Sequence, residues 1–115
     1  MNRGDVYWAD LSPRSGSEQS GRRPVIVVSH DAFNKAAGWH SFIVVPVSTS
    51  LALARRGPTA VRLDEAGDLL PRPSVALCHQ VTTLDRAKLR QRIGALPVQV
   101  LRSVEAGLKK ALDLD

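Results

Sequence analysis

Short apolar runs rich in β-branched residues recur along this 115-residue chain. The most apolar of them are residues 24–28 and 42–47. A continuous apolar run of this length, bounded by polar segments, is typical of a strand that is buried on both faces. Pro24 stands at the start of its run, where a missing N–H is tolerated. Further strand candidates are residues 5–11, 60–63, 74–81 and 92–94.

The pattern changes toward the C-terminus. Val100, Val104, Leu108 and Leu112 recur at a spacing of four, which predicts an amphipathic helix from about Pro97 onward. A shorter helix is expected over residues 32–37. No internal repeat or linker divides the chain, so residues 1–115 are expected to form a single domain. Many short strands and a terminal helix predict a mainly β (α+β) fold, either a twisted antiparallel sheet or a small barrel.

Composition narrows the class of protein. Hydrophobic residues make up 43% of the chain, as in ordinary globular domains, and the net charge of +5 favours an anionic partner. The single cysteine, Cys78, excludes an internal disulfide and a cysteine-based zinc site, and its apolar neighbours predict a buried position. The sequence has neither a signal peptide nor an apolar run long enough to span a membrane, so we expect a cytoplasmic protein.

Two basic residues stand where a polar loop, residues 12–22, enters a predicted strand. Pro24 biases Arg23 toward extended geometry, so Arg23 and its neighbour Arg22 could hold a phosphate. From these residues alone, a solvated basic pair before a strand is the favoured interpretation. Residues 48–50 end another strand with three hydroxyl groups, which suit phosphate contacts or an ordinary polar turn.

The remaining polar side chains indicate a function less clearly than these arginines and hydroxyl groups do. Gln80 could read a base edge or lie on the surface. The histidines, His30, His40 and His79, lack metal-ligand spacing, and the chain has no phosphate-binding or dinucleotide motif. We therefore expect neither a metal nor a cofactor.

Several segments taken together resemble the MazF/PemK (Kid) family of toxin endoribonucleases. Residues 3–11, 16–19 and 21–24 contain the family's first strand, Gly-Ser-Glu-Gln loop and Arg-Pro entry, in the family's order. Residues 45–50 resemble its Pro-Leu-Thr-Ser stretch, and residues 79–81 its acidic-Gln-Ile/Val step. The resemblance extends over nearly the whole chain.

The resemblance implies an SH3-like small β-barrel with a C-terminal α-helix, usually a homodimer. It implies the toxin of a type II toxin–antitoxin system, a metal-independent enzyme that cleaves single-stranded RNA at short sequences. Messenger RNA is the main expected substrate, with transfer and ribosomal RNA as other candidates. The expected protein partner is a cognate antitoxin with a disordered acidic tail, which suits a basic toxin.

The resemblance also assigns roles to residues. Arg23 falls on the family's catalytic arginine, and Ser48 falls on its catalytic threonine. Serine keeps the hydroxyl but loses the methyl group that stiffens the rotamer, so Thr49 is the second choice for this role. Because arginine is always protonated, Glu18 is the expected general base, with His79 next. The expected RNA-binding residues are Ser17, Gln19, Arg22, Asn34, Thr49, His79 and Gln80.

The expected reaction is attack of an RNA 2′-OH on its adjacent phosphate, which yields a 2′,3′-cyclic phosphate and a 5′-OH. The nucleophile lies within the substrate, so the protein only aligns it, moves protons and stabilises negative charge. Two alternatives remain open. One is a gyrase-poisoning toxin of the CcdB type, and the other is a basic nucleic-acid-binding module without catalysis.

Overall fold

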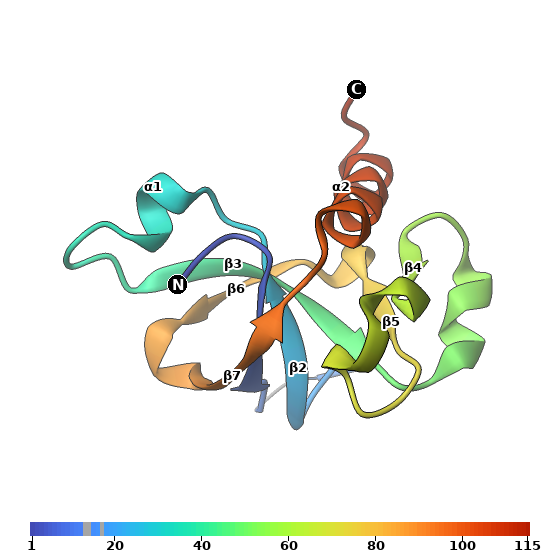
Figure 1. Cartoon of the computed structure of the whole chain (residues 1–115), viewed down its shortest axis with the longest axis horizontal. Helices are drawn as coiled ribbons and strands as arrows, with labels where there is room; N and C mark the ends of the chain where they lie inside the picture. Colours follow the sequence, from blue (N-terminus) through green and yellow to red (C-terminus); the bar gives the residue numbers. More distant parts are fainter. Residues whose placement is uncertain (13–14, 17) are drawn as a thin grey trace.

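The computed structural model describes residues 1–12, 15–16 and 18–115 (Figure 1). Its strands are β1 (Asp5–Asp10), β2 (Arg22–Val27), β3 (Ser41–Ser48), β4 (Ala60–Arg62), β5 (Val75–Leu77), β6 (Thr82–Asp85) and β7 (Leu89–Ala95). Its α-helices are α1 (Asp31–Asn34) and α2 (Val98–Leu112). Short 3₁₀ turns are η1 (Leu51–Arg56), η2 (Asp64–Leu69), η3 (Cys78–Gln80) and η4 (Arg86–Lys88).

The strands form one antiparallel sheet in the order β4-β5-β3-β2-β1-β7, and β6 pairs with the other half of β3. The predicted antiparallel sheet with a C-terminal helix is therefore confirmed. In the described part of the chain, the outermost strands β4 and β7 do not pair with each other. The sheet is thus open, and the expected barrel describes it only loosely.

Strand β3 is central to the sheet, because it pairs with three other strands, β2, β5 and β6. Its register with β2 matches Val25 to Pro46, and its register with β5 matches Val75 to Ser48. Both partners run antiparallel to β3. The first residues of β2 and of β5 therefore meet at the end of β3, although they are about fifty positions apart in sequence.

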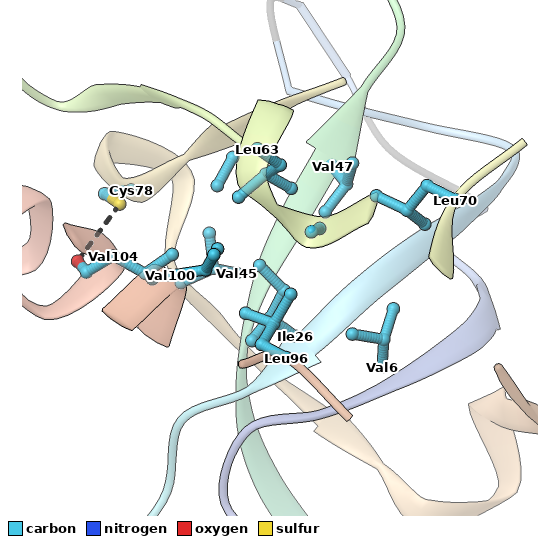
Figure 2. Close-up of a cluster of buried hydrophobic side chains, with 12 residues drawn as sticks. Val6, Ile26, Val45, Val47, Leu63, Leu70, Cys78, Leu96, Val100 and Val104 are labelled. Carbon is cyan, nitrogen blue, oxygen red and sulfur yellow. Dashed lines mark hydrogen bonds between the residues drawn. The ribbon is translucent and has the colours of Figure 1, made fainter. Parts of the chain in front are cut away.

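Both faces of the central strands are buried, which explains their continuous apolar sequence. Ile26 and Val45 face one core cluster, and Val25 and Val44 face the other. Figure 2 shows the first cluster, where side chains from the sheet meet side chains from α2. Its labelled members are Val6, Ile26, Val45, Val47, Leu63, Leu70, Cys78, Leu96, Val100 and Val104.

Helix α2 packs closely against β4 and the η3 turn. Gly107 makes this approach possible, because a Cβ atom there would lie 2.7 Å from Val61 Cγ2 and 2.8 Å from Cys78 Sγ. Cys78 is fully buried, as predicted, and its Sγ donates to the carbonyl oxygen of Val104 at 3.5 Å (Figure 2). Burial raises the pKa of the Cys78 thiol to about 11.

Several predicted boundaries were wrong. The strand expected over residues 74–81 ends at Leu77, because the chain then turns through η3. The helix expected over residues 32–37 is the single turn α1. Strand β6 and the short helical turns η1 and η2 were missed. The C-terminal helix was located within one residue of its start.

Within the described ranges, no helix has both the length and the hydropathy that a membrane span requires.

Candidate functional site

Arg23 and Ser48 lie at the same end of the sheet. The paired register of β2 and β3 ends at Val25 opposite Pro46, and each strand continues beyond that pair, β2 back to Arg22 and β3 forward to Ser48. The Nε of Arg23 donates to the carbonyl oxygen of Ser20 at 2.7 Å, which fixes the guanidinium against the incoming loop.

The two hydroxyl residues at the end of β3 differ in exposure. Ser48 is only 4% exposed, and its Oγ accepts from the backbone N–H of Ser50 at 3.1 Å. This bond holds the oxygen in place and leaves the hydroxyl hydrogen for another acceptor. Thr49 is exposed. The end of β3 therefore offers a fixed, buried hydroxyl at Ser48 and an accessible one at Thr49.

A small hollow of about 220 Å³, here called the arginine hollow, lies at this end of the sheet. Its lining residues are Trp8, Arg22, Arg23, Pro24, Val47, Thr49, Leu70, Pro71, Arg72 and Ser74. The guanidinium of Arg22 stacks over the Trp8 ring, 5.1 Å from its centroid, in a cation–π contact. Across the described residues, none of these three arginines forms an ion pair with a carboxylate. The hollow is therefore strongly electropositive.

A larger pocket of about 490 Å³, here called the glutamine pocket, lies nearby. Its lining residues are Leu11, Glu18, Gln19, Pro46, Arg56, Thr59, Ala60, Leu77, His79, Gln80, Val81 and Thr82. The backbone N–H of Gln19 donates to Gln80 Oε1 at 2.7 Å and so ties the loop before β2 to η3. The Oε1 atom of Gln19 is buried and has no hydrogen-bond partner among the described residues, so it can accept a bond from a bound molecule.

The two hollows lie on opposite faces of β3. Pro46 lines the glutamine pocket and its neighbour Val47 lines the arginine hollow, and successive strand residues point to opposite faces. Arg23 lines the arginine hollow together with Val47 and Thr49 and is not among the residues that line the glutamine pocket. The charged hollow and the polar pocket therefore lie on either side of β3.

The predicted residues divide between the two hollows, and the buried Ser48 lines neither of them. Arg22, Arg23 and Thr49 line the arginine hollow, whereas Gln19 and Gln80 line the glutamine pocket. Glu18 and His79 are both exposed and line the glutamine pocket. The carboxylate of Glu18 accepts a bond from Ser15 Oγ at 3.1 Å. Ser17 lies outside the described residues, so its predicted contact with RNA stays a prediction.

Asn34 stands apart from the other predicted residues. It follows the far end of β2, in α1, and it is 4% exposed. Its Nδ2 donates to the carbonyl oxygen of Ser29 at 2.8 Å and to Asp31 Oδ1 at 3.2 Å, and its Oδ1 accepts from Ser29 Oγ. The amide is therefore used inside the turn, which indicates a structural role.

Sequence reasoning missed three residues that line the two hollows. Arg56 and Thr59 come from η1 and the segment after it, and Arg72 comes from the segment before β5. Arg72 could have been found from its position between two prolines, Pro71 and Pro73, because they restrict its backbone. Over the described ranges, no three His, Cys, Asp or Glu side chains gather as a metal site.

Comparisons with known proteins agree with this geometry. A family model described as a PemK-like, MazF-like toxin of type II toxin–antitoxin systems matches residues 2–112. A curated relative, endoribonuclease MazF6 of Mycobacterium tuberculosis, is 37% identical over 114 residues, which cover 99% of this chain and 98% of the relative.

Solved structures support the same assignment. A crystal structure of MazF from Deinococcus radiodurans matches with a TM-score of 0.79 and 28% identity, covering 99% of this chain and 97% of that one. A MazE–MazF crystal structure from the same organism matches with a TM-score of 0.75 and 28% identity, covering 100% and 97%. The chain therefore belongs to the PemK-like, MazF-like family of toxins from type II toxin–antitoxin systems.

Proposed function

We propose that this endoribonuclease cuts single-stranded RNA at the end of β3, with Arg23 and Ser48 on the scissile phosphate and no metal ion. The observation that carries the proposal is the hollow that Arg22, Arg23 and Arg72 line at the end of β3, where Ser48 also holds a fixed hydroxyl. The Nε of Arg23 is held by Ser20, so its terminal nitrogens are preorganised for phosphate oxygens.

In the proposed reaction the 2′-oxygen forms a bond to phosphorus and the bond from phosphorus to the 5′-oxygen breaks. The products are a 2′,3′-cyclic phosphate and a 5′-OH. Arg23 stabilises the additional negative charge of the pentavalent transition state. The Ser48 hydroxyl donates to a non-bridging oxygen, since its own oxygen already accepts from the Ser50 N–H.

The reaction also needs a base for the 2′-OH proton and an acid for the leaving oxygen. Arginine is a poor base because it does not lose its proton near neutral pH. We assign the base to the carboxylate of Glu18, which is exposed and lines the glutamine pocket. His79 lines the same pocket and is the second candidate. The leaving 5′-oxygen takes its proton from Arg23 or from water.

The remaining lining residues are proposed to bind the RNA strand. Gln19 and Gln80 present amide groups in the glutamine pocket, which suits the edge of an unstacked base. Arg22 and Thr49 line the arginine hollow and suit the sugar–phosphate backbone. Messenger RNA is the expected main substrate, and transfer or ribosomal RNA the other candidates.

The proposed protein partners follow from the relatives and from charge. Because a related MazF is solved together with MazE, we propose that a cognate antitoxin covers this end of the sheet with an acidic segment. Three arginines without carboxylate partners in the described chain would attract such a segment. We further propose that two copies form a homodimer in the bacterial cytoplasm.

The test is cleavage of labelled RNA by the purified protein. Arg23→Ala should lower the cleavage rate by about 10²–10³-fold, the usual cost of removing one group that stabilises transition-state charge. Circular dichroism should show that the variant folds. Products should carry a 2′,3′-cyclic phosphate by mass spectrometry, and a 2′-deoxy nucleotide before the cut should abolish cleavage. Full activity of folded Arg23→Ala would refute the assignment.

A second comparison distinguishes the two hydroxyls. Ser48→Ala should lower the rate constant for cleavage, whereas Thr49→Val should weaken RNA binding and leave the rate at saturating RNA nearly unchanged. The reverse result would move the catalytic hydroxyl to Thr49. A chelator should leave the activity of the wild type intact, and loss of activity that added metal restores would contradict a metal-free reaction.

A further inference from the structure

We infer that Arg72 binds a backbone phosphate adjacent to the scissile one, and this inference rests on the proposed RNA cleavage. Arg72 lines the arginine hollow together with Arg22, Arg23 and Thr49. The arginines reach the hollow from two sides. Arg22 and Arg23 begin β2, whereas Arg72 precedes β5, and β3 lies between these two strands.

The strand registers support this arrangement. Val47 pairs with Ala76 and Ser48 pairs with Val75. One further step brings Thr49 opposite Ser74, and both of these residues line the arginine hollow. Positive charge therefore flanks the end of β3 on its β2 side and on its β5 side.

The backbone around Arg72 is restrained. Pro71 and Pro73 flank it, and a proline limits both its own φ and the conformation of the residue before it. The carbonyl oxygen of Arg72 accepts from Ser74 Oγ at 2.8 Å, and Ser74 is itself buried. The carbonyl oxygen of Ser74 accepts from the N–H of Leu63 at 3.0 Å. A residue held this way loses less conformational entropy when it binds a ligand.

The positive charges that line the arginine hollow favour the binding of an anion. Throughout the described residues, Arg22, Arg23 and Arg72 have no carboxylate partner, although all three line a hollow of about 220 Å³. Like charges at such short range repel, and a phosphate would relieve the repulsion while accepting paired bonds from a guanidinium. Because the proposed reaction assigns the scissile phosphate to Arg23, the arginine on the opposite flank is available for a neighbouring phosphate of the strand.

The first experiment measures binding without cleavage. A fluorescent RNA with a 2′-deoxy nucleotide at the cut is titrated by anisotropy at several salt concentrations. Arg72→Ala should weaken binding and reduce the slope of log K against log salt by about 0.7, the value for one phosphate contact on a single strand. Arg72→Lys should keep the slope. Arg102→Ala removes an exposed arginine of α2 and should change neither quantity.

The second experiment locates the phosphate. Neutral methylphosphonates replace the phosphates of the strand one at a time. At a single position next to the cut, Arg72→Ala should cost no further affinity, because the contact is already lost. An unchanged salt slope, or an equal effect of Arg72→Ala at every position, would overturn the inference. Wild type that binds the strand but does not cut its all-ribose form would instead refute the proposed cleavage.

Discussion

The backbone N–H of Gln19 donates to Gln80 Oε1, and this bond joins the loop before β2 to the η3 turn 61 positions later. Both residues line the glutamine pocket. The bond therefore couples the shape of the proposed base pocket to the position of Gln19, which belongs to no strand or helix.

Removal of this bond should loosen the loop. Gln80→Ala should raise the KM for RNA by roughly threefold to tenfold, the range that one net hydrogen bond supports. Amide exchange followed by NMR should show faster exchange of the Gln19 N–H. Gln91→Ala, an exposed glutamine on β7, is the matched control and should change neither value. An unchanged Gln19 exchange rate would show that the bond does not restrain the loop.

Gly107→Ala should destabilise the fold although alanine favours helices. The helix gains about 1 kcal/mol, but a Cβ atom within 3 Å of Val61 and Cys78 forces repacking that costs about 1–3 kcal/mol. Urea denaturation should report a net loss of stability of up to about 2 kcal/mol. Ser103→Ala, on the exposed face of α2, should be neutral or slightly stabilising. Adding Cys78→Ala to Gly107→Ala should restore part of the loss, and strict additivity would contradict the steric explanation.

Asp31 should contribute stability that disappears in acid. The N–H of Arg3 and the Asn34 amide donate to its carboxylate and hold its pKa below the ordinary value of 3.8. A lowered pKa in the folded state means that the contribution is present above pH 3.8 and is lost as the pH falls through the folded pKa. Asp31→Asn keeps an oxygen acceptor and removes the charge. Its urea midpoint should be lower than that of the wild type at pH 7, and the two should converge as the pH falls through the folded pKa of Asp31. A gap that stays constant would exclude the charge as its cause.

Cys78 should resist thiol reagents in the native protein. Burial and a pKa of about 11 keep the sulfur protonated and inaccessible at pH 8. A chromogenic disulfide reagent should therefore react with less than one tenth of the thiol in the time that it modifies all of the guanidinium-unfolded protein. Rapid modification without denaturant would indicate frequent opening between α2 and η3.

The strands that the sequence predicts are those whose own hydropathy pattern determines them. Residues 24–28 and 42–47 correspond to most of β2 and most of β3, and both faces are buried over residues 25–27 and 44–47. Ile43 is the exception, since it is 45% exposed. Strand β6 gave no such signal, because only Leu84 among its residues is buried. Its strand geometry comes from pairing with Ser41–Val44, a tertiary contact that sequence periodicity does not report.

Some residues of the candidate site were likewise predictable from local sequence, and others were not. Arg23 was located by the proline that follows it, and Ser48 by its place at the end of an apolar run. Arg72 was missed because its proximity to Thr49 depends on the pairing of β5 with β3. Asn34 was included because a sequence motif does not reveal that a local turn already satisfies its amide.

Strand β3 pairs with β2 on one side and with β5 on the other. The arginines of the arginine hollow therefore come from two different connecting segments, the one before β2 and the one before β5. Each of these segments can change in length or sequence without disturbing the hydrogen bonds between the strands of the sheet. Transplanting the segment before β5, or the one before β2, from a related toxin should therefore change which nucleotides are cut while the inherited sheet keeps its stability.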